Sequence, residues 1–170
     1  MQKTMDKDEF DEVLIALGQI GAAQREYGYE LELLNSDNDD EKIRFKFERY
    51  TDSKNRVNRE AARQSVKKKI AELNGTKEAI IRNLEIQFSD TNGNIRRYLD
   101  GRQRFIMTNP YTGKKYGIDP KSRRVTLYYL LLLERRVTNG LPICTSDYIE
   151  MENYFKTDKC TYPKELFAKQ

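Results

Sequence analysis

Apolar residues recur every three or four positions in the first part of the chain, which is the spacing of one face of an α-helix. The stripe begins at Phe10 and passes through Leu17. Asp6, followed three residues later by Glu9, resembles the capping box that often starts a helix. The pattern therefore predicts a helix from about residue 7 to residue 26.

Two later stretches indicate β-structure instead. Apolar residues alternate with acidic residues over 29–33 and with basic residues over 43–47, and a polar turn sequence lies between them. Such alternation is typical of paired strands, and the opposite charges would face each other across the pair. We predict a β-hairpin at about 29–47, with one continuous helix through residue 34 as the alternative. Short apolar runs and turn sequences predict a second hairpin insertion at about 84–118.

A thinner apolar stripe at helical spacing follows the first predicted hairpin. Ser53 is a candidate N-cap for a helix over 53–73, and Asn74-Gly75 is a typical stop signal at its end. A separate short helix, capped by Thr76, is predicted to follow. Two helices joined by a tight turn are thus expected in this region.

The strongest predicted element is a helix over 122–137, because its run Leu127–Leu133 is apolar on every side. A helix of this kind belongs at the centre of a core. The chain is therefore expected to be mainly α, a helical bundle with one or two β-hairpins, and α+β is the alternative. We expect a helical body over 1–140, followed by a C-terminal arm over 141–170 that contains a short helix at 146–155.

Charge is distributed unevenly along the 170 residues. Residues 1–41 carry 12 acidic and 3 basic groups, residues 42–136 carry 10 acidic and 24 basic groups, and the remainder is nearly neutral. A basic middle segment indicates an anionic partner, which is either nucleic acid or an acidic protein surface. The alternative is that the acidic segment folds back onto the basic segment of the same chain.

The residue types of most catalytic and metal centres are scarce. There is no histidine, which excludes histidine-dependent triads and zinc sites. The two cysteines, Cys144 and Cys160, are expected to be buried thiols. The acidic patch 37–41 and the calcium-loop-like start 90–94 are interpreted as solvated turns. In the second of these, Ile95 stands where a calcium loop needs glycine, and Gly101 stands where it needs glutamate. We expect no catalytic, cofactor-binding or metal-binding residue, and no enzymatic activity.

No membrane contact is expected either. The opening sequence lacks the apolar stretch of a secretory signal. The longest apolar run, Leu127–Leu133, is far shorter than the roughly 20 residues that cross a bilayer. These features predict a protein that is cytoplasmic on synthesis.

One functional hypothesis is a helix-turn-helix nucleic-acid-binding protein at residues 67–84. Four small or apolar residues there have the spacing of a close helix crossing: Ala71, Gly75, Ile81 and Leu84. Basic residues surround them and would contact phosphates. The alternative is an ordinary helical hairpin with a basic, solvated face. The candidate residues for nucleic-acid binding or for an interface are Lys67, Lys68, Lys69, Lys77, Arg82, Arg123 and Arg124.

The first-ranked hypothesis is an assembly protein. An acidic surface on one copy that meets a basic surface on the next makes a heterologous contact, and such contacts close into rings. The acidic candidates are Asp8, Glu9 and Glu12. The alternative functions are regulatory adaptors and enzymes without a recognisable motif.

In the order of its helices, its candidate hairpin at 29–47 and its arm from Gly140 to Pro163, the chain resembles connector or adaptor ring proteins of tailed phages. This resemblance implies a homo-oligomeric ring, docking of the arm on neighbouring structural proteins, and a location in the virion. It implies no cofactor.

Overall fold

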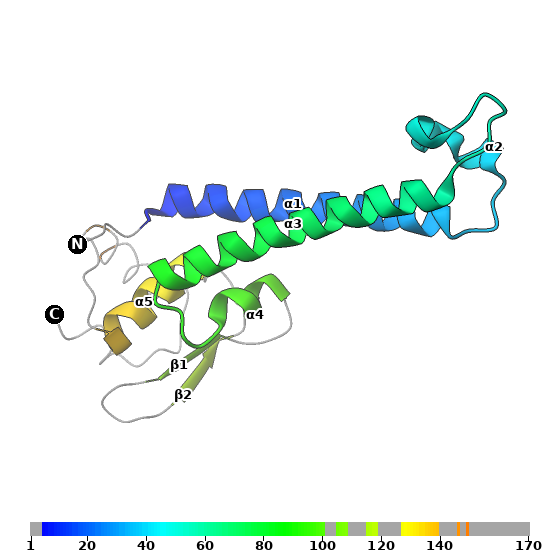
Figure 1. Cartoon of the computed structure of the whole chain (residues 1–170). Helices are drawn as coiled ribbons and strands as arrows, with labels where there is room; N and C mark the ends of the chain where they lie inside the picture. The colour runs from blue at the N-terminus through cyan, green and yellow to red at the C-terminus, as the bar shows by residue number, and fades with distance from the viewer. Residues whose placement is uncertain are drawn as a thin grey trace. The chain divides into compact units, whose positions relative to one another are not determined.

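The computed structural model describes residues 5–100, 105–108, 115–118, 127–139, 146 and 149, with side chains described for 5–100, 127–135, 146 and 149. The chain divides into two compact units. The first unit comprises Met1–Phe10 and Ile81–Gln170, and the second comprises Asp11–Ile80. Figure 1 shows the elements, which are α1 (Lys7–Leu34), α2 (Asp40–Ile43), the 3-10 turns η1 (Arg44–Lys46) and η2 (Glu48–Tyr50), α3 (Arg59–Gln87), α4 (Asn94–Asp100), β1 (Phe105–Thr108), β2 (Lys115–Ile118) and α5 (Leu127–Asn139).

The mainly helical fold class is confirmed. Helix α1 starts with the predicted capping box, in which the Glu9 backbone N–H donates to Asp6 Oδ1 at 2.8 Å and the Asp6 N–H donates to Glu9 Oε2 at 3.2 Å. These two bonds satisfy N–H groups that have no partner inside the helix. The start of this helix therefore follows from local sequence.

The hairpin predicted at about 29–47 is wrong, and the alternative of one helix through Leu34 is correct. Leu31 and Leu34 continue the inward stripe of α1, so alternation over five residues was a coincidence of helical spacing. In the second half of the predicted hairpin, α2 and η1 stand where the strand over 43–47 was expected. Ile43 and Phe47 are buried, whereas Phe45 between them is 70% exposed, because a helical turn points them in different directions.

Helix α3 is continuous from Arg59 to Gln87, so the predicted stop at Asn74-Gly75 is wrong. Thr76 caps no new helix, since its hydroxyl donates to the Glu72 carbonyl four residues earlier at 3.2 Å. The N-cap is Asn58 rather than Ser53, and the Asn58 Oδ1 accepts the Ala61 N–H at 3.1 Å. A helix-turn-helix motif needs a turn at this point, and the structure therefore contradicts that motif.

The second predicted hairpin, at about 84–118, is not confirmed as drawn from the sequence. Its first part is the end of α3, and α4 follows where strands and turns were expected. Among the described residues of this stretch, β1 and β2 pair with each other and run antiparallel, with Phe105 opposite Ile118.

Helix α5 lies at the centre of the first unit, as its sequence predicts. Every residue from Leu127 to Leu133 is at most 2% exposed. The Tyr128 ring packs against Phe10 and Phe88, with ring centroids 5.5 and 5.9 Å apart. These contacts bring together the start of α1, the segment after α3 and α5, and they form the core of this unit.

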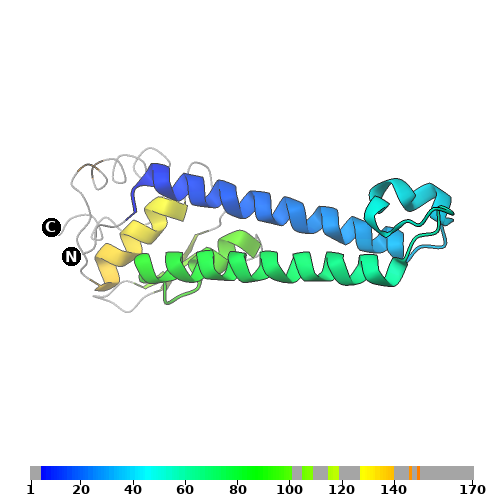
Figure 2. The ribbon, with the colours of Figure 1, turned by 45° about the horizontal axis from the view of Figure 1, so that its top comes forward.

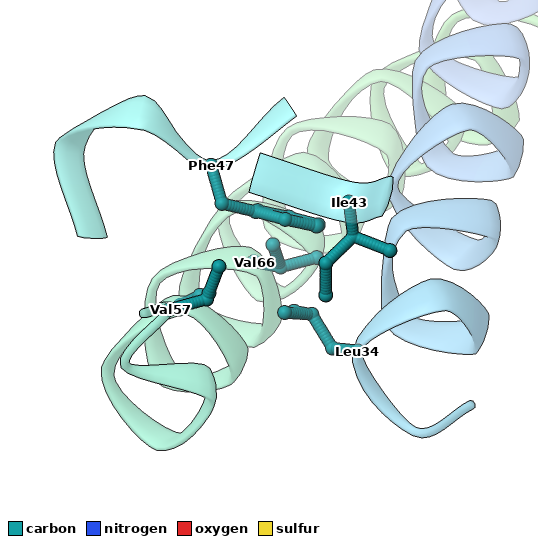
Figure 3. Close-up of a cluster of buried hydrophobic side chains, with 6 residues drawn as sticks. Leu34, Ile43, Phe47, Val57 and Val66 are labelled. Atoms are coloured by element: carbon teal, nitrogen blue, oxygen red, sulfur yellow. The ribbon is translucent and has the colours of Figure 1, made fainter. Parts of the chain in front are cut away.

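In the second unit, the chain between α1 and α3 folds onto the ends of these helices and encloses a small core, shown in Figure 3. We call this part, residues 35–58, the tip. The core consists of Leu34, Ile43, Phe47, Val57, Ala62 and Val66. Of the predicted arm at 141–170, only Ser146 and Ile149 belong to the described residues, so the rest of the arm and both cysteines lie outside them.

Candidate functional site

The segments of α1 and α3 in the second unit, residues 11–34 and 59–80, lie side by side and run in opposite directions (Figures 1 and 2). We call this pair the stem. Gln24 Nε2 donates to Asn74 Oδ1 at 2.5 Å and thereby fixes which residues of the two helices lie level with each other. All stem residues are described, and Leu17 alone is buried among residues 13–31, while none is buried among residues 67–80. The middle of the stem thus has little core of its own.

The outward face of α1 carries a second stripe, separate from the one that faces α3. It consists of Ile15, Gly18, Ala22 and Tyr29, spaced by three, four and seven residues, and all four are exposed. This spacing places them on one side of a helix. Ile15 is 61% and Tyr29 is 57% exposed, and apolar residues at regular spacing on one face are typical of a helix-packing surface.

The outward face of α3 carries a matching stripe of small residues. Ala71, Gly75 and Ala79 follow one another at intervals of four and are all exposed. Small residues at this spacing leave a shallow groove, which allows a second helix to approach closely. The two outward stripes are therefore complementary in shape, because the α1 stripe includes two large side chains and the α3 stripe consists of small residues alone.

Gly18 belongs to the α1 stripe, and Gly75 is the central residue of the α3 stripe. A Cβ placed on either glycine meets no heavy atom of the described residues within 4 Å, apart from the backbone of its own helix turn. Glycine inside a helix costs about 0.5–1 kcal/mol relative to alanine. Neither glycine is needed for packing within the described part of the chain, although each destabilises its helix.

The stem helices differ in charge. The α1 segment carries five acidic groups and one basic group, whereas the α3 segment carries three acidic and six basic groups. Glu12 and Glu26 are exposed on α1, and Lys67 and Lys68 are exposed on α3. Opposite charge on the two outward faces favours contact between unlike helices over contact between like ones.

The remaining candidate residues have varied positions. Lys69 is exposed, and its Nζ lies 5.5 Å from the centroid of the Tyr27 ring of α1. Lys77 is half-buried in the stem, and Arg82 is exposed on the part of α3 in the first unit. Asp8 and Glu9 are exposed in the first turn of α1. Arg123 and Arg124 lie outside the described residues.

Within one chain, the acidic candidates do not meet the three lysines. Lys68 lies level with about residue 30 of α1, as the Gln24–Asn74 bond implies, and Glu12 is 18 residues from Glu30. At 1.5 Å per residue, that separation is about 27 Å along the helix. Folding of the acidic segment back onto the basic segment therefore does not bring Glu12 into an ion pair with Lys68 of the same chain.

The tip is held to the stem by Arg59, which sequence reasoning did not single out. Its Nη1 donates to the carbonyls of Leu34 at 3.2 Å and Ser36 at 2.9 Å, and its Nη2 donates to Asp40 Oδ1 at 2.9 Å. The Val57 N–H donates to Asp40 Oδ2 at 2.9 Å. This N–H and then the Arg59 guanidinium hold the pKa of Asp40 below its ordinary value. Arg59 thus supplies donors to carbonyls at the end of α1 that the helix leaves open.

A pair of buried acids, Asp90 and Glu134, was also missed from the sequence. Asp90 accepts the backbone N–H groups of Asn94 at 3.1 Å and Ile95 at 2.9 Å. Glu134 accepts the side-chain amides of Asn92 at 2.8 Å and of Asn94. Only the tertiary fold brings Asp90 and Glu134 together, since 44 positions separate them.

Burial raises the pKa of both acids. The pKa of Glu134 rises to about 7, first because of burial and then because of the nearby Asp90 charge, and the pKa of Asp90 is also raised by burial. In acid–base catalysis, the surroundings of two neighbouring carboxyls typically push their pKa values apart, so that one stays protonated and the other ionised. Here, however, their oxygens hold the start of α4 and the preceding loop to α5. This arrangement gives Asp90 and Glu134 a structural role.

Nowhere in the described ranges do three or more Asp, Glu, Cys or His side chains gather as a bound metal ion requires. Within the part of the chain that the structure describes, no helix combines the length and apolar content needed to cross a membrane. Comparison of the chain with protein-family models, curated protein sequences and solved structures gives no match.

Proposed function

We propose that the chain is a non-enzymatic assembly component that associates with further copies of itself, the outward face of α1 in one copy packing against the outward face of α3 in the next. The observation that carries this proposal is the pair of exposed stripes at helical spacing, each of which contains a glycine with open space above it. Close helix contact would bury the apolar side chains and use the space above the glycines.

Charge favours contact between unlike helices. Two α1 faces brought together would juxtapose acidic side chains, and two α3 faces would juxtapose lysines. Like charges across an interface are disfavoured, whereas α1 against α3 places opposite charges together. A contact between two different surfaces of the same chain is heterologous, and repetition of such a contact forms a ring when the rotation closes.

The stem itself supplies a register for this contact. Gln24 is level with Asn74, and the helices run in opposite directions, so Gly18 and Ala22 are level with about residues 80 and 76 of α3. When neighbouring copies are related by rotation about an axis parallel to the stem, each residue keeps its position along that axis from one copy to the next. In such a ring, Gly18 and Ala22 of one copy would therefore face the region of Ala79 and Gly75 of the next.

A place in a virion, as a head–tail connector ring that docks on neighbouring structural proteins, is part of this proposal. Its support is the resemblance in organisation to phage connector and adaptor proteins. The β-hairpin expected at 29–47, which was one feature of that resemblance, is replaced in the structure by the end of α1 and by the tip, so the resemblance now rests on helix order and on the arm.

The mass of the assembly in solution tests the proposal. We expect the protein to form a closed oligomer by light scattering coupled to size exclusion, and Lys67→Glu with Lys68→Glu to weaken it. Each exposed ion pair contributes ~0–1 kcal/mol, so the loss per contact is small, but it is repeated around a ring. The matched control is Lys42→Glu with Lys54→Glu, which reverses two exposed lysines of the tip and is expected to leave the mass unchanged.

Compensating substitutions then identify the direction of neighbouring copies. Glu26→Lys with Glu30→Lys should restore assembly if the stems run the same way, because Glu30 lies level with Lys68. Asp8→Lys with Glu12→Lys should restore it if the stems run in opposite directions. Glu9 is left unchanged because its carboxylate accepts the Asp6 N–H and so completes the capping box. Rescue is the signature of direct juxtaposition.

A monomer at every concentration would contradict the proposal. A lysine reversal that abolishes retention on heparin and leaves the mass unchanged would contradict it as well, and would favour nucleic-acid binding by the basic face of α3. That second function would proceed without a helix-turn-helix, because α3 has no turn.

A further inference from the structure

The second unit contains a pocket between the tip and the stem, with a volume of about 410 Å³. The residues from 45 to 50 form one side, and Glu30 of α1 with Ser65 and Lys69 of α3 form the other. The lining is mainly polar and is therefore unlike the core cluster beside it. None of the residues in the outward stripes contributes to it, and Glu30 is the one lining residue that also takes part in the compensating substitutions of the proposed contact between copies.

Three cationic side chains line this pocket: Lys46, Arg49 and Lys69. All three are exposed. Neighbouring basic residues of the tip are engaged in ion pairs, such as Arg44 with Glu41 at 3.4 Å and Arg56 with Asp52 at 3.0 Å. Among the described residues, none of the three lining cations has an acidic side chain within ion-pair distance. Within the described ranges, none of the three charges is therefore neutralised by an ion pair, although the Lys69 ammonium also lies over the Tyr27 ring.

An exposed aromatic ring adjoins these cations. Phe45 lines the pocket and is 70% exposed, and the guanidinium carbon of Arg44 lies 4.8 Å from the centroid of its ring. Aromatic residues, phenylalanine included, and arginine are enriched in the cores of protein–protein interfaces. The pocket therefore combines sites for anionic groups with an apolar contact.

The lining also contains two acids, Glu30 and Glu48. A nucleic acid places a phosphate at every step along its backbone, and such closely spaced charge would be repelled by these carboxylates. A peptide can place its carboxylates several residues apart and put a hydrogen-bond donor or an apolar side chain between them. The mixed lining consequently favours a protein segment over a nucleic acid.

From this chemistry we infer that the pocket binds an acidic segment of a partner protein, with the partner's carboxylates at Lys46, Arg49 and Lys69 and an apolar side chain against Phe45. This is an interaction beyond self-assembly through the stem. It provides a second attachment point, which a structural component requires if it is to dock on a different protein.

The test uses the full chain and a fluorescein-labelled peptide in which glutamates alternate with alanines around a central leucine, and binding is followed by anisotropy. Lys46→Glu with Arg49→Glu is expected to weaken binding about tenfold or more, because exposed ion pairs each contribute up to about fivefold and the reversals replace attraction by repulsion. Phe45→Ala should weaken it severalfold when the peptide carries leucine and have no effect when alanine replaces that leucine.

The matched control is again Lys42→Glu with Lys54→Glu, which changes the net charge equally at tip residues that do not line the pocket. Equal weakening by this control would overturn the inference, because it would show a dependence on net charge alone. No binding of the peptide would overturn it too. Single-stranded oligothymidylate that binds as tightly, and loses binding through Lys46→Glu with Arg49→Glu, would overturn it in favour of a nucleic acid.

The oligomeric mass separates this inference from the proposed function. Lys46→Glu with Arg49→Glu should leave the mass unchanged, and Lys67→Glu with Lys68→Glu should leave peptide binding largely intact. A fall in mass caused by Lys46→Glu with Arg49→Glu would overturn the assignment to a different protein, because it would identify a second copy as the occupant.

Discussion

Replacing Gly18 and Gly75 by alanine is expected to raise the stability of the folded chain and to weaken its assembly at the same time. A Cβ at either position meets open space within the described part of the chain. Removing a helix-interior glycine stabilises by about 0.5–1 kcal/mol, so the double variant should gain about 1–2 kcal/mol. For a chain of this length, that corresponds to a rise in melting temperature of about 2–8 °C.

The same two methyl groups would obstruct a close contact between copies. In the proposed contact, each added Cβ enters a space that the neighbouring helix fills, and overpacking of this kind costs about 1–3 kcal/mol. Because 1.4 kcal/mol corresponds to a tenfold change in an equilibrium constant, the concentration needed for half-assembly should rise at least tenfold. The opposite signs of the two effects distinguish an intermolecular role of the glycines from a purely local one.

Sedimentation velocity over a range of concentrations measures assembly, and chemical denaturation at the lowest concentration measures the stability of the separated chain. Gly28→Ala is the matched control, since Gly28 lies in the same helix, outside the outward stripe, with equal space around its Cβ. It should stabilise the chain without changing assembly. If Gly18→Ala with Gly75→Ala stabilised the chain and left the assembly concentration unchanged, close helix approach through these glycines would be refuted.

Three further predictions concern stability. Leu130→Asp should unfold the first unit, because Leu130 is 1% exposed and an unpaired buried carboxylate costs several kcal/mol, whereas the free energy of unfolding of a typical protein is about 5–15 kcal/mol. A cooperative thermal transition near the wild-type temperature would contradict this. The pKa of Glu134 in the folded chain is about 7, above its ordinary value, so between pH 4.5 and 7 the folded chain holds a proton on Glu134 that the unfolded chain loses. The free energy of unfolding should therefore fall by on the order of 2 kcal/mol as pH rises from about 4.5 to 7. Glu134→Gln should flatten that dependence in denaturation curves. Arg59→Met should cost about 2 kcal/mol, and Arg59→Lys should restore little of it because lysine lacks the forked donors, as urea denaturation would measure.

Elements with strong local signals were predicted well from the sequence. The capping box at Asp6 and Glu9 fixes the start of α1, since its two hydrogen bonds join groups three residues apart. The run Leu127–Leu133 is apolar on every side, and such a helix is stable only when it is surrounded. The uneven charge of the two stem helices also follows directly from residue order.

The continuity of α3 through Gly75 was decided by tertiary packing. A stop signal at Asn74-Gly75 is worth only about 1 kcal/mol. Ile81 and Leu84 beyond it are at most 3% exposed, and burial of such a side chain contributes about 1.5–3 kcal/mol. The local preference for a turn was therefore overcome by residues whose burial depends on distant parts of the chain.

The same reason explains which features of the candidate sites remained hidden in the sequence. Charge and spacing identify Lys67, Lys68 and Lys69 as a basic cluster, but only the packing of α1 against α3 turns Lys69 toward Tyr27. Asp90 and Glu134 carry no local signal of their pairing. Sequence by itself determines hydrogen bonds and periodicity within a few residues, whereas the partner of an exposed or buried side chain depends on which distant helix lies beside it.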